Sequence, residues 1–175
     1  MTSSSPSGQP RIPITGRVAE LWASTDAVGF LRSWTTGDVP QGPHAEHTGN
    51  RLVDVPEAGS IVMAWTPGPQ LANLTGGVHG GYLSLVCDEA AGLAAASTGE
   101  RFVPMITLDL DVTYLRPAVT GAEHRVEGAV LHAGRQRIVS EARVLTPDGK
   151  LAVSARGSFI PNARFVERLQ AQGES

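Results

Sequence analysis

The chain has 175 residues, which is enough for one domain with its own core, and no feature of the sequence marks a second one. Apolar residues make up 41% of the chain and charged residues 18%, as is typical of a globular protein. The formal net charge of −3, without any long run of Lys or Arg, argues against a nucleic-acid-binding protein.

The cysteine content and the N-terminal residues bear on the compartment in which the protein works. Cys87 is the only cysteine, so no internal disulfide can form and a reducing compartment is expected. Residues 1–13 lack the apolar segment of a secretion signal, and no apolar stretch reaches the roughly 20 residues that a membrane span needs. We expect a cytoplasmic protein whose partners include neither a membrane nor a nucleic acid.

The first 48 residues are predicted to form an extension that precedes the main domain. Residues 1–14 are rich in Ser, Pro and Gly, and we expect them to be disordered. Two helix-like segments follow, over residues 17–24 and 26–34, and Asp26 is the expected N-cap of the second.

The composition of residues 37–49 predicts a loop. This loop contains His44 and His47 in an H-x-x-H arrangement. Because no third ligand is in view, a solvated loop is favoured over a metal site, and no metal is expected.

Six segments predict β-strands, two before a central helix and four after it, and they cover residues 51–55, 60–66, 103–114, 124–132, 137–146 and 151–160. Pro-Asp-Gly at 147–149 predicts a hairpin turn between the last two strands. A short helix is expected over residues 163–170.

The strand predicted over 103–114 alternates between apolar and polar residues, which predicts two distinct faces. The apolar, core-facing set is Ile106, Leu108, Leu110, Val112 and Tyr114, and the opposite set is Thr107, Asp109, Asp111 and Thr113.

The stretch between the two groups of strands is the centre around which the rest is built. Residues 73–81 are polar and rich in glycine, and the helix predicted over 82–96 is apolar on almost every side, so it must be buried on almost every side. Asp88 lies near the middle of this helix, where a carboxylate is costly unless it is paired or functional. The glycines let a ligand approach the free N–H groups of the helix N-terminus, which attract negatively charged oxygen. Together these features predict an active site.

An antiparallel sheet wrapped around one buried helix follows from this order of elements. One small curved sheet cannot cover a helix that is apolar all round, so a second copy of the chain is the simplest candidate for the remaining face. Gly80 and Asp88 are also about 12 Å apart along one helix, whereas both must lie about 3 Å from a carbonyl that they serve together. We therefore predict a composite site across a two-fold dimer, with Gly80 from one subunit and Asp88 from its partner.

The small residues on the helix face of Asp88 are expected to allow this close approach, namely Ser84, Ala91 and Ala95.

The residue types suggest roles in acyl chemistry. The Gly80 N–H, at the positive end of the helix, would stabilise an oxyanion. Asp88 would attack the carbonyl as a nucleophile or take a proton from water as a base. Asn73 could hold a substrate group or orient a loop, and His79 is either a general base or a histidine that orients the loop.

Structural interpretations compete with these roles. The pair Asp88-Glu89 could be a solvated break in the helix, although its apolar flanks argue against this. Glu89 lies about 100° round the helix from Asp88 and is expected to be a structural or solvent-facing charge. Cys87 is expected to be a core residue, because no base is evident beside it.

The pattern N-x5-HGG-x6-D-E-A resembles the hot-dog fold acyl-CoA thioesterases, and it is carried by Asn73, His79, Gly80, Gly81, Asp88, Glu89 and Ala90. The closest subgroup is the 4-hydroxybenzoyl-CoA thioesterase-like and phenylacetate-pathway type. The later segments ITLDLDVTYLRPAVTG, G-x-V-x-H-x-GR and DGKLAVSARGSF resemble the same group, so that the likeness covers about residues 50–160.

The resemblance implies an α+β hot-dog fold in which an antiparallel sheet surrounds one long helix, with an N-terminal helical extension over 1–48. The hot-dog domain would span 49–162, and 163–175 would form a short C-terminal helix and tail. The implied assembly is a homodimer that pairs into a dimer of dimers. The implied activity is hydrolysis of an acyl-CoA, without metal and with no cofactor, since coenzyme A is part of the substrate.

The resemblance also implies site residues. Asp88 becomes the catalytic carboxylate, Gly80 the oxyanion donor, and Asn73 and His79 positioning residues. Thr107 corresponds to a hydroxyl residue that helps to position water in some members. The substrate-binding candidates are Gly81 and, for the phosphates of coenzyme A, Arg116, Arg135, Arg137 and Arg156.

Two other functions remain open. A hot-dog acyl-CoA hydratase or dehydratase would pair a histidine with an acid near the reacting carbon, which the position of His79 before the helix disfavours. A non-catalytic acyl-CoA-binding module is the second alternative, and the presence of Asp88 argues against it.

Overall fold

The structure is a computed structural model that describes residues 16–167. The disorder predicted for residues 1–14 and the end of the helix predicted over 163–170 lie outside this range. Residues 163–167 are helical, as expected. No helix in the described part of the chain is both long and apolar enough to cross a membrane.

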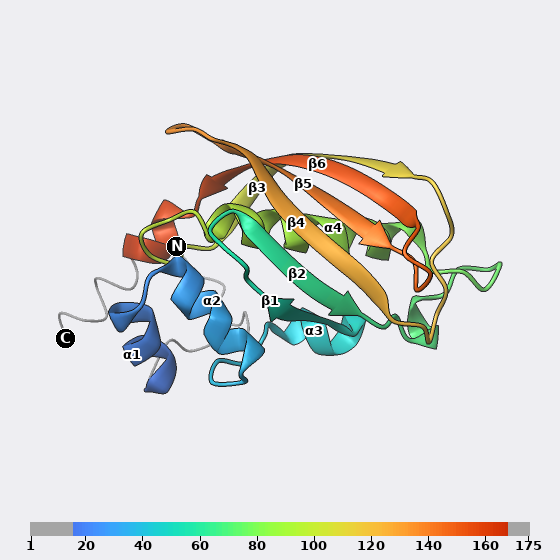
Figure 1. Ribbon diagram of the computed structural model, residues 1–175, viewed down its shortest axis with the longest axis horizontal. Helices are drawn as coiled ribbons and strands as arrows, with labels where there is room; N and C mark the ends of the chain where they lie inside the picture. Colours follow the sequence, from blue (N-terminus) through green and yellow to red (C-terminus); the bar gives the residue numbers. More distant parts are fainter. Residues whose placement is uncertain (1–15, 168–175) are drawn as a thin grey trace, which may run out of the picture.

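A six-stranded antiparallel sheet curves around one long helix, α4 (Gly80–Ala96), which confirms the expected α+β hot-dog fold (Figure 1). The strands lie in the order β1-β2-β4-β5-β6-β3. Their bounds are Asn50–Asp54 for β1, Ser60–Trp65 for β2, Met105–Tyr114 for β3, His124–Ala133 for β4, Ile138–Leu145 for β5 and Leu151–Pro161 for β6. The ten-residue strand β3 therefore lies at an edge of the sheet, and no other strand within residues 16–167 pairs with its outer side.

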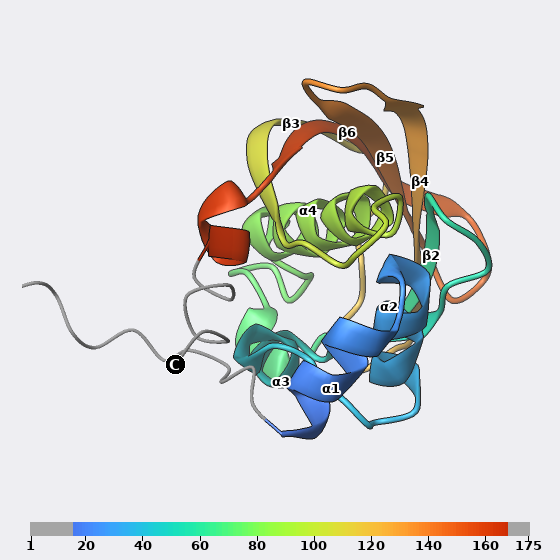
Figure 2. The same ribbon diagram turned by 90° about the vertical axis from the view of Figure 1, so that its left-hand side faces the viewer.

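The apolar sequence of α4 is buried against the concave face of the sheet, which arches over the helix in Figure 2. Val86, Cys87 and Ala90 are fully buried. The backbone of β4 comes so close to the helix that a side chain at Gly128 would meet the Ala90 carbonyl oxygen. The predicted burial of the helix is thus confirmed, and it fixes the place of Asp88 in the molecule.

The predicted faces of β3 are correct for its second half and wrong for its first half. An extra residue interrupts the pairing with β6, because Thr107 lies opposite Phe159 while Asp109 lies opposite Ser158. This β-bulge reverses the alternation at that point. Consequently Leu110 and Val112 pack against the core as expected, whereas Ile106 and Leu108 are 43% and 53% exposed, and Thr107 turns toward α4.

The two predicted N-terminal helices are present as α1 (Arg17–Ser24) and α2 (Ala27–Thr35). Asp26 caps α2 as expected, since its Oδ1 accepts a hydrogen bond of 2.6 Å from the Gly29 N–H. The Phe30 ring of α2 stacks on Phe102, which follows α4, with 5.0 Å between the ring centroids. The helices therefore contribute to the same core, although the domain boundaries near residues 49 and 162 stay predictions.

The loop predicted over 37–49 is wrong for its second half, where α3 (Pro43–Thr48) forms. Pro43 starts this helix at a position where its missing N–H costs nothing, and Gly49, with φ of 78°, ends it in the left-handed conformation. Figure 2 shows α1, α2 and α3 on the side of α4 that faces away from the sheet.

Candidate active site

The loop that precedes α4 is held in shape by its own polar groups. Asn73 Oδ1 accepts hydrogen bonds from the Thr75 N–H at 2.9 Å and from the Thr75 hydroxyl at 2.7 Å. The chain turns at Gly76, whose φ of 85° suits glycine. Of the two roles predicted for Asn73, the structure gives the geometry for orienting the loop.

The first turn of α4 leaves one N–H group without a partner. His79 is the N-cap, and its Nδ1 accepts a hydrogen bond of 3.0 Å from the Gly81 N–H. The Tyr82 N–H bonds to the His79 carbonyl oxygen at 3.0 Å. Within the described part of the chain the Gly80 N–H makes no hydrogen bond. Gly80 is therefore the donor that a bound oxygen would meet at this helix end, whereas the Gly81 N–H is already used by His79.

Asp88 is half-buried and faces strand β3. The Thr107 hydroxyl donates a hydrogen bond of 2.9 Å to Asp88 Oδ1. Burial raises the pKa of the Asp88 carboxyl above its ordinary value; the Thr107 hydrogen bond opposes this shift, and the negative charge of Glu89 adds to it. The structure thus brings together two of the predicted catalytic residues, Asp88 and Thr107, through the β-bulge that the sequence pattern did not reveal.

Tyr114 is a residue of this site that the sequence did not single out. Its hydroxyl lies 2.5 Å from Ser84 Oγ and donates a hydrogen bond of 3.0 Å to the Gly80 carbonyl oxygen. The sequence pattern placed Tyr114 on the core-facing side of this strand, and that placement was the signal from which its contact with α4 could have been predicted. Since Thr107 lies beside Asp88 and Tyr114 beside Gly80, β3 runs antiparallel to α4 and touches both halves of the candidate site.

The helix face expected to receive a partner is only partly available. Ala91 and Ala95 are fully buried within their own chain, so they do not present the small surface that we expected. Ser84 and Asp88 remain half-exposed. The open part of α4 near the site is therefore its N-terminal half.

Glu89 has a structural environment, which is one of the two alternatives predicted for it. Its side chain is 12% exposed, and its carboxylate accepts hydrogen bonds from His44 Nε2 at 2.9 Å and from Asn50 Nδ2 at 2.5 Å. The prediction that His44 lies in a loop is therefore wrong, since it lies in α3; its side chain is exposed, as expected, but it binds Glu89 of α4. Burial, together with the negative charge of Asp88, raises the pKa of the Cys87 thiol to about 12, which makes Cys87 an inert core residue.

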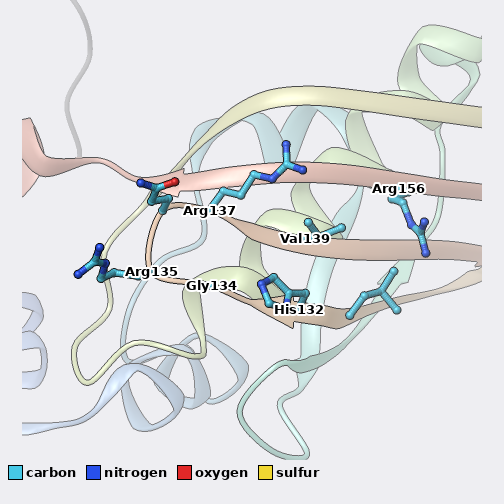
Figure 3. Close-up of a pocket in the computed structure, with 8 residues that line it drawn as sticks. His132, Gly134, Arg135, Arg137, Val139 and Arg156 are labelled. Atoms are coloured by element: carbon cyan, nitrogen blue, oxygen red, sulfur yellow. The ribbon is translucent and has the colours of Figure 1, made fainter.

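The arginines proposed for coenzyme A do not gather at Asp88. Arg135, Arg137 and Arg156 line a cavity of about 610 Å³ with His132 on the outer face of the sheet, and α4 lies behind the strands in Figure 3. Arg116 is elsewhere, where its Nη1 donates a hydrogen bond of 2.7 Å to the Leu151 carbonyl oxygen.

No group of three or more His, Cys, Asp or Glu residues that could hold a metal ion occurs within residues 16–167.

Comparisons with known proteins show which family and which folds this chain resembles. The profile of the thioesterase superfamily matches residues 75–153, which include α4, β3, β4 and β5 and the start of β6. A candidate esterase of Saccharolobus solfataricus is 36% identical over 100 residues, which are 57% of this chain and 66% of that protein. The chain therefore spans slightly less than two thirds of the length of this curated relative.

Solved structures share the fold. A conserved protein of Pseudomonas aeruginosa is 32% identical with a TM-score of 0.62, and the match covers 68% of this chain and 93% of the other. A candidate thioesterase of Ralstonia eutropha, described as a phenylacetic acid degradation-related protein, is 26% identical with a TM-score of 0.67, and the match covers 74% of this chain and 97% of the other. A protein of Streptococcus mutans bound to acetyl-CoA is 23% identical with a TM-score of 0.60, covering 71% and 91%.

The environment of Asp88 predicts that the carboxylate costs stability at neutral pH. Because the pKa of Asp88 is raised in the folded state, folding becomes more favourable as the pH falls from the folded pKa to the unfolded value of about 3.9. Asp88→Asn removes the charge and keeps an oxygen that Thr107 can bind. We expect this variant to have a higher Tm than the wild type above the folded pKa, with the two curves converging below pH 4. A Tm series between pH 3 and pH 8 would refute this if the difference did not depend on pH.

Proposed function

We propose that this chain, which belongs to the thioesterase superfamily, is a thioester hydrolase that cleaves an acyl-CoA into a free carboxylic acid and coenzyme A. The observation that carries the proposal is the half-buried Asp88 carboxylate, which is oriented by the Thr107 hydroxyl beside the free edge of the sheet. A carboxylate costs free energy in such a place unless it has a use.

Asp88 either attacks the thioester carbonyl carbon with its own carboxylate oxygen or activates the water molecule that attacks it. As a nucleophile it would form an acyl anhydride and expel the thiolate of coenzyme A, and water would then cleave the anhydride. As a base it would take a proton from the water that attacks the carbonyl carbon. In both routes the Thr107 hydroxyl holds one carboxylate oxygen, so that the other is left to react.

The Gly80 N–H would stabilise the negative charge that develops on the carbonyl oxygen. This N–H has no hydrogen-bond partner among residues 16–167, and the partial positive charge of the helix N-terminus adds to its effect. His79 would act through the loop rather than on the substrate, because its Nδ1 already holds the Gly81 N–H.

A two-fold dimer would bring the two halves together. Gly80 and Asp88 lie in one continuous helix and are roughly 12 Å apart along its axis, which is too far for one carbonyl. If the free edges of two copies of β3 pair antiparallel about a point midway between Thr107 and Tyr114, the Thr107–Asp88 end of one chain meets the Tyr114–Gly80 end of the other. This pairing would also cover the exposed edge of the sheet. A dimer of dimers remains part of the proposal.

The binding of coenzyme A is supported by likeness. The Streptococcus mutans protein of similar fold was solved with acetyl-CoA bound. In this chain, Arg135, Arg137 and Arg156 place cations around a cavity. Because that cavity opens on the outer face of the sheet, these arginines would serve an active site only if the coenzyme reached round the sheet or across to another copy. We keep the proposals of a cytoplasmic location and of no cofactor beyond the substrate.

The direct test is release of free thiol from a panel of aliphatic and aromatic acyl-CoA esters. We expect the wild type to hydrolyse part of this panel and Asp88→Asn to lower kcat by about a hundredfold or more, because the attacking group is lost. Enoyl-CoA esters in the same panel report on hydration through loss of their conjugated absorbance. Binding without thiol release, or hydration alone, would contradict the proposal.

The role of the Gly80 N–H can be tested with a matched pair of variants at one position. Gly80→Pro removes the N–H at the first helical position, where proline is favoured, and the His79 backbone (φ −66°, ψ 134°) suits a following proline. Gly80→Ala keeps the N–H, and its Cβ would lie 3.5 Å from the Tyr114 ring, an ordinary contact. We expect Gly80→Pro to lower kcat by about 100-fold to 1,000-fold and Gly80→Ala to lower it far less. Equal losses in the two variants would exclude the N–H from the mechanism.

A further inference from the structure

We propose that His44, in the N-terminal extension, is a positioning residue that keeps the Asp88 carboxylate ionised for the reaction, because it neutralises the charge of Glu89, the neighbour of Asp88 in the chain. The proposal rests on the proposed function only in giving Asp88 a catalytic task. It assigns a role to the helix α3, which the active-site chemistry described above does not use.

The geometry is a polar cluster between α3, β1 and α4. The Glu89 carboxylate is held by His44 Nε2 at 2.9 Å and by Asn50 Nδ2 at 2.5 Å. Asn50 is itself buried and accepts a hydrogen bond from the Thr48 hydroxyl. The Thr48 carbonyl oxygen accepts a hydrogen bond of 2.9 Å from the indole of Trp65 in β2. Each member is fixed by the next, so that Glu89 has a defined position although it is a long, charged side chain.

The cluster matters because Glu89 is the covalent neighbour of Asp88. A carboxylate that is 12% exposed is weakly screened by solvent, so its charge disfavours the ionisation of a second carboxyl group nearby. Glu89 has this effect on Asp88, whose pKa its charge raises. The hydrogen bond and the charge of Glu89 in turn raise the pKa of His44 and outweigh the effect of burial. His44 therefore stays cationic over a wider pH range than a free histidine, and while it is cationic it balances the charge of Glu89.

The other titratable groups packed near α4 have different contacts. On the sheet, His124 bonds to the Ala122 carbonyl oxygen, and the Tyr114 hydroxyl bonds to Gly80. In α3, the His47 ring lies 6.1 Å from the ring of Tyr82, and Glu46 is exposed. Within the described part of the chain, the charge that acts on Asp88 is that of Glu89, and the cation on Glu89 is His44.

The test is a double-mutant cycle on His44 and Glu89. For each variant, kcat is measured as a function of pH, and the variants are compared by the midpoint, which is the pH at which kcat falls to half of its maximum on the acidic side. His44→Gln keeps a hydrogen-bond donor and removes the charge, so we expect the midpoint to rise by on the order of half a pH unit. Glu89→Gln removes the negative charge and should lower the midpoint by a similar amount. In the Glu89→Gln background, His44→Gln should have no effect. His44→Lys, which restores the cation without the ring, should return the midpoint to the wild-type value.

Glu46→Gln is the matched control, since it removes an exposed carboxylate from the same helix, and it should leave the midpoint unchanged. Titration of Asp88 by 13C NMR of the carboxyl carbon, in the protein without substrate, gives the same midpoint without relying on activity. If no variant hydrolyses any thioester, the proposed function fails and the NMR midpoints still decide the present inference. The inference would be overturned if His44→Gln shifted the midpoint equally in the wild type and in the Glu89→Gln variant. It would also be overturned if Glu89→Gln raised the midpoint.

Discussion

The burial of one apolar helix inside a curved sheet is the constraint from which the rest of the molecule follows. Because the sheet covers much of α4, its polar residues Asp88 and Glu89 are partly shielded from bulk water and contact side chains of neighbouring elements. Asp88 faces the edge strand and is held by Thr107, while Glu89 faces the N-terminal extension and is held by His44. The two adjacent carboxylates thus lie in different environments, which are set by the elements that pack on either side of one helix.

The length of α4 and the position of β3 together argue for an assembly of two chains. The donor at Gly80 and the carboxylate at Asp88 belong to one rigid helix, so no local movement brings them to the same atom. The strand β3 contacts α4 near both residues, through Thr107 at Asp88 and Tyr114 at Gly80, and its outer edge is unpaired in the part of the chain that the structure describes. An unpaired edge that connects two half-sites has the geometry that a two-fold axis would complete.

Residue pattern alone predicted the features that depend on periodicity and composition, and missed those that depend on a single inserted residue or a distant contact. The buried helix, the six strands and Asp88 follow from the distribution of apolar residues. The extra residue in β3 has no signature in the sequence, so Thr107 was assigned to the wrong face. The helix α3 resembles a loop because it is short and contains Pro43. The pairing of His44 with Glu89 joins residues 45 positions apart, and no local rule predicts it.

The central claim, that one active site takes Gly80 from one chain and Asp88 from the other, is tested most directly by mixing two inactive variants. Asp88→Asn and Gly80→Pro chains are unfolded together in equal amounts, refolded and assayed for thiol release. Random pairing makes half of the dimers mixed, and each mixed dimer holds one intact composite site. The account predicts recovery of about a quarter of the wild-type rate per chain. A mixture no more active than its components would contradict it, because it would mean that each site is built within a single chain.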